Sequence, residues 1–159
     1  MKTNAARYLD SLQISYELRD YALDTEDFSA IIVAEKIGLP PEQVFKTLLC
    51  VTSDKEHVFA VVPGNAELDF KKLAHAAGAR KAEMVSLKDI QPLTGYIRGG
   101  VTVFGAKKNF PVYVDETVEL FDTVSVSAGI KGTQIVLSPA DYIRAAEATV
   151  ADLTKGGTS

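Results

Sequence analysis

The sequence predicts an α/β fold of the α+β type, in which helices pack on a mixed, mostly antiparallel and strongly curved sheet. Helix signals alternate along the chain with pairs of apolar strand segments, and short polar or glycine-rich turns join the members of each pair. The chain has 159 residues, 47% of them apolar, without an internal repeat or a low-complexity linker. One domain over 1–159 is therefore expected, with 154–159 as a flexible tail.

The first third of the chain predicts two helices separated by a strand. Asn4 is a suitable N-cap for a short helix over 4–12, where apolar residues recur at helical spacing. Apolar and polar residues alternate over 14–18, which is the pattern of a strand. A second helix is expected over 29–37, because Gly38 follows it as a C-cap and two prolines prevent its continuation.

Two apolar runs in the middle of the chain predict an antiparallel hairpin with both faces largely covered. They span 46–52 and 58–63, and the polar residues 53–57 form the turn between them. A helix over 69–75 that ends at Gly78 follows. The remaining expected elements are a short helix capped by Ser86, a glycine-rich loop over 94–100, strands over 101–104 and 112–114, a helical turn over 117–121, a hairpin of strands 124–127 and 134–137, and a helix over 138–153.

The charge of the chain is unevenly distributed. The net charge is −4, which argues against a nucleic-acid partner because phosphate binding depends on Lys and Arg. Residues 71–131, however, carry nine Lys and Arg against six Asp and Glu, a net charge of +3, which leaves −7 for the rest. This asymmetry is compatible with a basic face that meets a polyanion, although a solvated lysine surface would have the same composition.

Several classes of protein are excluded by what the sequence lacks. The single cysteine, Cys50, allows no internal disulfide, which fits a reducing cytoplasm. The charged N-terminal residues do not resemble a signal peptide, and no apolar stretch is long enough to span a bilayer. Motifs for a nucleophilic serine, a zinc site, an EF-hand or a Walker A loop are absent. Metal catalysis and catalysis by a serine or cysteine nucleophile are therefore not expected, and no cofactor is implied.

Lys46 is the most unusual residue of the predicted hairpin. Period-two alternation places it on one strand face with Leu48, Cys50 and Thr52. Lysine at the head of an apolar strand either extends its charge into water from an edge or is itself a cation held at the rim of a pocket. Cys50 is expected to be a small buried hydrophobic residue, since a nucleophilic thiol needs a nearby cation and partial exposure.

Two glycine-containing segments are candidate binding loops. Residues 99–105 offer exposed backbone N–H groups to an anion or oxyanion, although glycine pairs also form plain turns. The turn over 127–132 has the same two interpretations. Tyr21 and Tyr96 stand beside loop residues, where a tyrosine either fills a packing gap or donates a hydroxyl.

Taken together, five segments carry a specific resemblance. They are Val44-Phe-Lys-Thr-Leu-Leu49, Leu68-Asp-Phe-Lys-Lys-Leu-Ala74, Thr94-Gly-Tyr-Ile-Arg-Gly-Gly100, Val126-Ser-Ala-Gly129 and Gly132-Thr-Gln-Ile135. In this order they resemble the YbaK/EbsC family of Cys-tRNA(Pro) deacylases, which are relatives of the editing domain of bacterial prolyl-tRNA synthetases. The resemblance covers roughly residues 5–150. It implies a compact mixed α/β editing domain that hydrolyses the ester joining a wrong amino acid to tRNA(Pro).

The resemblance also implies roles for individual residues. Lys46 matches the family's hallmark lysine, and the loop of Gly99 and Gly100 is implied to line the aminoacyl pocket, so these three residues are the expected catalytic set. An aminoacyl ester is already activated, so positioning and charge stabilisation by Lys46 and loop amides can suffice, with the substrate's own thiol or ribose hydroxyl as a possible nucleophile. The expected substrate-binding residues are Tyr21, Tyr96, Val101, Thr102, Ser127 and Gly129.

The basic segment is expected to face the acceptor end of the tRNA. Its expected contacts are Lys71, Lys72, Arg98, Lys107, Lys108 and Lys131. Because a domain with a net charge of −4 should hold free tRNA weakly, prolyl-tRNA synthetase is an expected partner that supplies part of the tRNA specificity. No membrane or metal partner is expected.

Two departures from the family pattern bear on the substrate. The family usually has Ser-Pro where this chain has Thr102-Val103, and an acidic residue is common near Gln134. Without the proline the loop is less restricted, so the choice among cysteine, alanine and serine is open. Two further interpretations remain: a non-catalytic module that binds tRNA or a synthetase, and a small-molecule binder that uses the same pocket.

Overall fold

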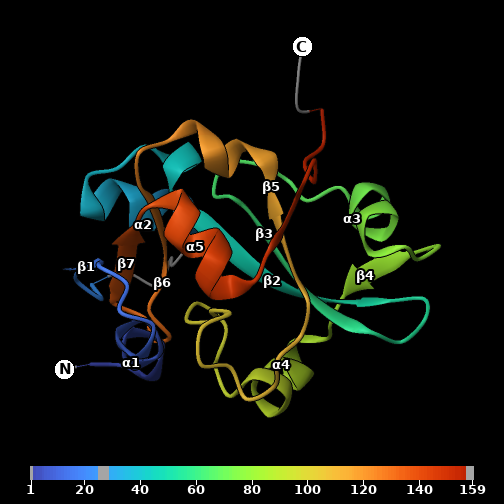
Figure 1. The fold of residues 1–159 in the computed structure, drawn as a ribbon, viewed down its shortest axis with the longest axis horizontal. Coiled ribbons are helices and arrows are strands. Elements are labelled where there is room, and N and C mark those ends of the chain that lie inside the picture. Colours follow the sequence, from blue (N-terminus) through green and yellow to red (C-terminus); the bar gives the residue numbers. More distant parts are fainter. Residues whose placement is uncertain (1, 25–28, 157–159) are drawn as a thin grey trace.

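The computed structural model describes residues 2–24 and 29–156 and contains two β-sheets surrounded by short helices (Figure 1). The smaller sheet has the antiparallel strand order β1-β7-β6, with β1 at Glu17–Asp20, β7 at Thr133–Leu137 and β6 at Val124–Ser127. The larger sheet has the order β4-β2-β3-β5-β8. Its strands are β4 (Ala82–Met84), β2 (Phe45–Thr52), β3 (His57–Pro63), β5 (Val112–Asp115) and β8 (Thr149–Ala151).

The strand pairing confirms the predicted mixed, mostly antiparallel architecture. β4, β2 and β3 are antiparallel neighbours, whereas β5 runs parallel to β3 and β8 runs parallel to β5. The predicted single sheet is divided in two, and one isolated bridge between Val44 and Ser125 joins the beginning of β2 to β6. This junction brings the hairpin of the smaller sheet next to the strand that carries Lys46.

Seven short helical segments surround the sheets in the described residues. They are α1 (Asn4–Ser11), α2 (Ala30–Ile37), the 3-10 turn η1 (Pro41–Gln43), α3 (Phe70–Ala77), α4 (Leu87–Thr94), the 3-10 turn η2 (Glu116–Leu120) and α5 (Pro139–Ala146). Ser29, Asp69 and Ser138 cap α2, α3 and α5 by accepting backbone N–H groups of the first turn. Gly38 and Gly78 are the predicted C-caps of α2 and α3, and both adopt the left-handed conformation. Thr3 caps α1 in place of the expected Asn4.

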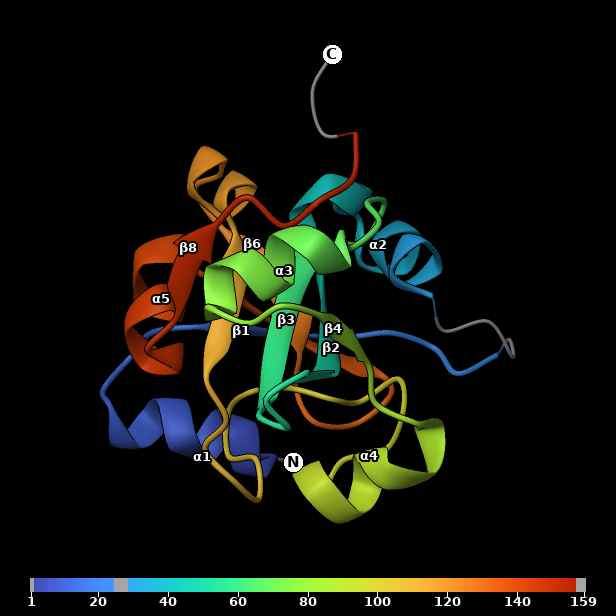
Figure 2. The ribbon, with the colours of Figure 1, turned by 90° about the vertical axis from the view of Figure 1, so that its right-hand side faces the viewer.

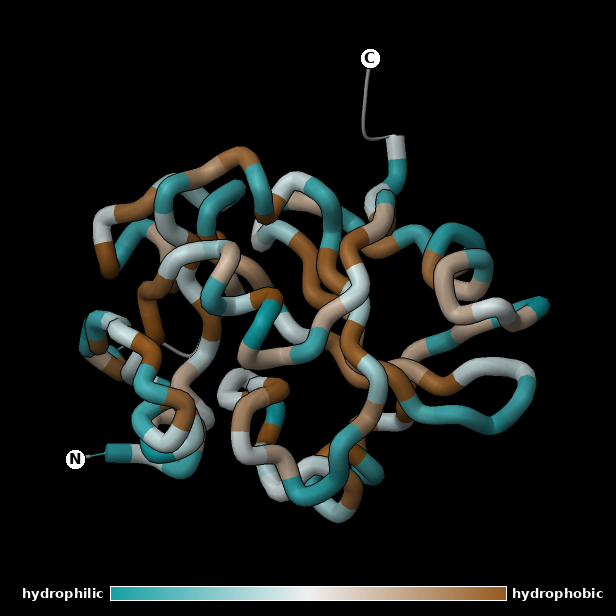
Figure 3. The backbone as a smooth tube through the Cα atoms, in the orientation of Figure 1, coloured by the Kyte–Doolittle hydropathy of each residue, from teal (hydrophilic) through white to brown (hydrophobic). Residues whose placement is uncertain are grey.

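The apolar strands form the centre of the molecule, as the hydropathy colouring in Figure 3 shows. The main cluster joins β2 and β3 of the larger sheet to β6 and β7 of the smaller one, with α1, α4 and α5 packed around it. The opposite face of β2 and β3 is covered by α3, which lies across it in Figure 2. Cys50 belongs to this second cluster and Leu49 to the first, so the predicted alternation along β2 is confirmed.

Three predicted elements differ from the structure. The last helix ends at Ala146, because Glu147 adopts a left-handed conformation with φ 50°, and residues 149–151 then pair with β5 instead of continuing the helix. Residues 101–104 form no strand, and the first strand begins at Glu17 rather than at residue 14. Within the predicted tail, Thr154 is buried and bridges to Leu68, and residues 157–159 lie outside the described residues.

Two local features complete the description of the fold. The three-residue strand β4 has no counterpart in the sequence prediction, because it is held by pairing with the end of β2. Helices long and apolar enough to cross a membrane are absent from residues 2–24 and 29–156.

Candidate active site

The first half of β2 forms an open edge of the larger sheet. β3 pairs with β2 along its whole length, whereas β4 pairs with it only from Cys50 to Thr52. Among the described residues, the single bridge of Val44 to Ser125 is the other strand contact on that side. The Leu49 carbonyl accepts the Val85 N–H at 3.0 Å, so the segment from Lys46 to Leu48 is the part of this edge that is accessible to a ligand.

A cavity of about 740 Å³ lies at this edge. Five chain segments converge on it: the start of α2, β2, the β4–α4 segment, the glycine loop and the β6–β7 hairpin. Side chains from both faces of β2 contribute, since the cavity wraps around the strand. The described lining residues are Ser29, Ala30, Phe45, Lys46, Thr47, Leu48, Leu49, Met84, Val85, Leu87, Ile90, Arg98, Gly99, Val101, Ser127 and Lys131.

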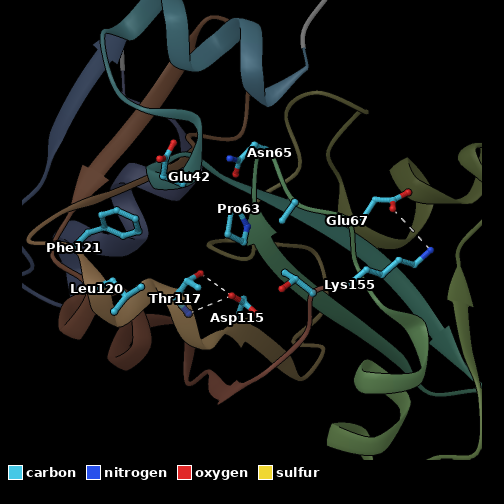
Figure 4. Close-up of a pocket in the computed structure, with 11 residues that line it drawn as sticks. Glu42, Pro63, Asn65, Glu67, Asp115, Thr117, Leu120, Phe121 and Lys155 are labelled. Carbon is cyan, nitrogen blue, oxygen red and sulfur yellow. Dashed lines mark hydrogen bonds and ion pairs between the residues drawn. The ribbon is translucent and has the colours of Figure 1, made fainter. Parts of the chain in front are cut away.

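The charges of the cavity are all positive. Its described lining contains Lys46, Arg98 and Lys131 and no carboxylate, although the chain has more acidic than basic residues. A second cavity, of about 530 Å³, has the opposite character, as the close-up in Figure 4 shows: three carboxylates and only one cation, Lys155, line it. The first cavity is thus the one suited to an anionic ligand.

Lys46 is half-buried on β2, and its ammonium has one acceptor among the residues that the structure describes. Nζ donates to the carbonyl of Gly64 at 3.4 Å, the long end of the hydrogen-bond range. Burial lowers the pKa of Lys46 below its ordinary value, and the carboxylate of Glu67 partly opposes this effect. A weakly held ammonium in a cavity whose described lining has no carboxylate can instead bind an arriving anion.

The glycine loop supplies backbone groups to the cavity through Gly99 and Val101. Gly100 differs from its neighbours, because its N–H donates to the Ile97 carbonyl at 2.9 Å and closes a turn. Among the described residues, the Gly99 and Val101 N–H groups have no backbone acceptor. These two amides, rather than that of Gly100, are therefore available for an oxyanion in this conformation.

Tyr96 and Thr102 lie inside the protein beside the loop and do not line the cavity. The Tyr96 hydroxyl donates to the Phe104 carbonyl at 2.7 Å, and burial raises the pKa of this tyrosine. The Thr102 hydroxyl oxygen accepts the Phe104 N–H at 3.4 Å, with the side chain almost fully buried. Both side chains hold the loop in shape, and their predicted contact with substrate would require the loop to move.

Of the other predicted substrate-binding residues, Ser127 lines the cavity, whereas Gly129 and Tyr21 do not. Ser127 lines the cavity, and its hydroxyl oxygen accepts the N–H of Gly129 at 3.2 Å. Gly129 has φ 99° and lies against the Tyr96 ring, outside the lining. Tyr21 is buried against α2, and its hydroxyl has no hydrogen-bond partner within residues 2–24 and 29–156.

The predicted tRNA contacts are separated by the fold. Arg98 and Lys131 line the cavity, where they can meet a phosphate. Lys72 is engaged elsewhere, because its Nζ donates to Asp152 at 2.9 Å and to the Thr154 carbonyl at 2.7 Å. The three remaining lysines are exposed outside the described lining: Lys71, Lys107 and Lys108. The basic segment of the sequence is therefore not one continuous part of the site.

The apolar wall of the cavity was not predicted. Met84, Val85, Leu87 and Ile90 form it, from β4 to the first turns of α4. Met84 and Leu87 are 42% and 58% exposed, which is unusual for large apolar side chains and marks them as contact surface. Their sequence carries no local signal for this role, because it depends on β4 pairing with the end of β2.

Gln134 and Cys50 are both internal. Gln134 Oε1 accepts the Ser125 hydroxyl at 2.7 Å between β6 and β7, so this departure from the family pattern is absorbed within the small sheet. Cys50 is completely buried, and burial raises the pKa of its thiol to about 12. Its thiol therefore stays protonated, as expected for a packing residue.

The comparisons with known proteins agree on one family. Residues 28–145 match the aminoacyl-tRNA editing domain. The chain is 42% identical over 153 residues, 96% of its length and 93% of the relative's, to EbsC of Enterococcus faecalis, which is named a candidate Cys-tRNA(Pro)/Cys-tRNA(Cys) deacylase. It is 28% identical over 119 residues, 72% of its length and 71% of the relative's, to the multifunctional Ser/Thr-tRNA deacylase ProXp-y of Escherichia coli.

A solved structure supports the same fold. The crystal structure of a candidate trans-editing enzyme for prolyl tRNA synthetase superimposes with a TM-score of 0.84. The match covers 98% of this chain and 99% of that one, at 23% sequence identity.

Proposed function

The chain belongs to the aminoacyl-tRNA editing domain family, and from this premise we propose that it is an aminoacyl-tRNA deacylase that acts in trans on mischarged tRNA(Pro). The preferred substrate is Cys-tRNA(Pro). The observation that carries the proposal is the cavity at the open edge of β2, where three cations and two loop amides meet without a carboxylate in the described lining. Such a cavity suits the terminal nucleotide of a tRNA with its attached amino acid.

The reaction follows from the position of these groups. A nucleophile, either water or a group of the substrate itself, attacks the ester carbonyl carbon, and negative charge develops on the carbonyl oxygen. The N–H groups of Gly99 and Val101 stabilise this oxyanion, while the Lys46 ammonium holds the ribose or phosphate beside it. The ester bond then breaks, and the ribose oxygen takes a proton as it leaves. Positioning suffices because an aminoacyl ester is already activated.

The amino acid is selected by the size and polarity of the cavity. Cysteine is proposed because the relative with 42% identity is named for Cys-tRNA(Pro) and Cys-tRNA(Cys). The Escherichia coli relative is named for Ser- and Thr-tRNA, so serine is a realistic competitor. The apolar wall formed by Met84 and Leu87 favours a thiol over a hydroxyl, since a hydroxyl would lose its hydrogen bonds to water there.

Prolyl-tRNA synthetase is the proposed partner, and the cytoplasm is the proposed location. The net charge of −4 leaves the domain with weak attraction for free tRNA at physiological salt. A synthetase that still holds its mischarged product would supply the missing affinity. If the protein binds bare tRNA equally tightly with and without the synthetase, this part of the proposal is contradicted.

The proposal is tested by incubating the protein with Cys-, Ala- and Ser-tRNA(Pro) and measuring loss of the ester, with the Lys46→Ala variant in parallel. Cys-tRNA(Pro) is expected to be deacylated fastest, and Lys46→Ala is expected to lose most of this activity. If none of the three esters is lost faster than in buffer, the chain is not a deacylase. If Lys46→Ala is as active as the wild type, the role of Lys46 is wrong.

A further inference from the structure

The acceptor of the Lys46 ammonium is part of an unusually crowded turn. Gly64 follows β3, and its carbonyl accepts Nζ of Lys46 at 3.4 Å. A Cβ added to Gly64 would lie 2.6 Å from Cβ of Ala30, 2.9 Å from the Val44 carbonyl oxygen and 3.3 Å from that of Pro41. Gly64 is not among the glycines with positive φ. The lack of space for a Cβ, and not the backbone conformation, therefore requires glycine at this position.

A backbone hydrogen bond holds the same turn in place. The Gly64 N–H donates to the Val44 carbonyl at 2.7 Å, which fixes the turn to the start of β2. Ala30, on its other side, is the first residue of α2 and lines the cavity together with Lys46. Gly64 thus lies where β2, α2 and η1 meet, and it sets the distance between two walls of the cavity.

The turn also carries the charge that acts on Lys46. Glu67 is the carboxylate that stabilises the Lys46 ammonium, while Arg98 and Lys131 are the other charged groups in the described lining of the cavity. In Figure 4, Pro63, Asn65 and Glu67 project along the second cavity, where Glu67 lies 4.0 Å from Lys155. The turn therefore lines the second cavity and reaches the first one through the hydrogen bond of its Gly64 carbonyl to Lys46.

We propose that the turn from Pro63 to Glu67 is the positioning element for Lys46, with the Gly64 carbonyl fixing the place of the ammonium and the Glu67 carboxylate supporting its charge. Gly64 and Glu67 act through Lys46 and touch no reacting atom. The inference rests on the proposed deacylase function only for its kinetic consequences. Its structural content, the control of Lys46 by this turn, is measurable without any substrate.

The experiment compares Glu67→Gln and Gly64→Ala with Glu42→Gln as the matched control. Glu42 is another exposed carboxylate of the second cavity, and no interaction joins it to Lys46 in the structure. The pKa of Lys46 is followed by NMR of isotope-labelled protein, with the Lys46 signal identified by its loss in Lys46→Met. Deacylation of Cys-tRNA(Pro) is measured on the same samples as a function of pH.

Glu67→Gln is expected to lower the pKa of Lys46 and to move the alkaline loss of activity to lower pH, with KM unchanged. Gly64→Ala is expected to reduce kcat about tenfold or more, with KM altered less than about threefold, because a small displacement of a catalytic group costs rate rather than affinity. Glu42→Gln should change neither quantity. An unchanged Lys46 pKa in Glu67→Gln overturns the inference, even where Gly64→Ala does not fold. Absent deacylation with a lowered Lys46 pKa overturns the proposed function instead.

Discussion

The hydroxyl of Tyr96 donates a 2.7 Å hydrogen bond to the carbonyl of Phe104, and this bond closes the loop that carries Gly99 and Val101. The same tyrosine ring lies against Gly129, whose Cβ position would be 3.0 Å from Cε1 of the ring. One internal side chain therefore holds the glycine loop and the β6–β7 turn together. Both segments contribute residues to the cavity, so its shape depends on a residue outside its lining.

Replacing Tyr96 with phenylalanine should destabilise the protein by about 1–3 kcal/mol, because the Phe104 carbonyl is left buried without a donor. Chemical denaturation measures the loss, and kcat for Cys-tRNA(Pro) should fall as the loop loosens. Unchanged stability would mean that the loop does not depend on this hydrogen bond.

Gly129→Ala is expected to cost more stability than Gly38→Ala. Both glycines have positive φ, 99° and 78°, so each alanine pays about 1–2 kcal/mol of backbone strain. Gly38 faces open space, whereas Gly129 meets the Tyr96 ring. Urea denaturation measures the free energy of unfolding of both variants, and the difference between their losses reports the contact with the Tyr96 ring. Equal losses would mean that the ring moves aside without a loss of stability.

Lys46→Met should abolish most of the activity and yet stabilise the protein at neutral pH. Lys46 positions the ester in the proposed mechanism, and loss of such positioning costs about 10²-fold in kcat. Burial lowers the pKa of Lys46, so its charged form is disfavoured in the folded state and the neutral methionine removes that penalty. The wild type recovers the same stability once its own lysine deprotonates, so the advantage of the variant should shrink as the pH rises toward 10.5. Urea unfolding at neutral and alkaline pH measures the difference in the free energy of unfolding between the variant and the wild type. A difference that does not decrease as the pH rises would contradict this prediction.

Arg98→Gln and Lys72→Gln should separate tRNA contact from structural pairing. Arg98 lines the cavity, so its loss should raise KM and reduce the slope of log affinity against log salt by about one. Lys72 already binds Asp152 and the Thr154 carbonyl, so its replacement should affect stability and leave KM unchanged. Filter binding over a range of salt concentrations measures both, and equal slopes for the two variants would remove Arg98 from the interface.

Local signals were sufficient to predict most of the helices and the two hairpins. The caps at Ser29, Asp69 and Ser138 are sequence-local interactions, and the β2–β3 hairpin joins segments only a few residues apart. The elements that were missed depend on distant partners. β8 exists because residues 149–151 pair with β5, more than 30 residues earlier, and no local pattern distinguishes that strand from a longer helix.

The residues of the candidate site show the same difference between local sequence signals and contacts made by the fold. Lys46, Gly99 and Ser127 could be predicted, since each stands in a recognisable segment, and the structure brings all three to one cavity. Tyr96 and Thr102 belong to equally recognisable segments but point into the protein. The sequence contains no local signal for the role of Gly64, because the crowding that requires glycine there comes from α2, η1 and β2 together.

The burial of Cys50 has a consequence for a protein that would handle cysteinyl esters. A reactive thiol near the cavity would compete with the substrate, because it could take over the acyl group as a thioester while the ribose oxygen leaves. Cys50 is fully covered, and its thiol has a pKa near 12. Cys50, the only thiol of the chain, is therefore unavailable for acyl exchange with the proposed substrate. The domain can bind a thiol-containing ligand without reacting with it.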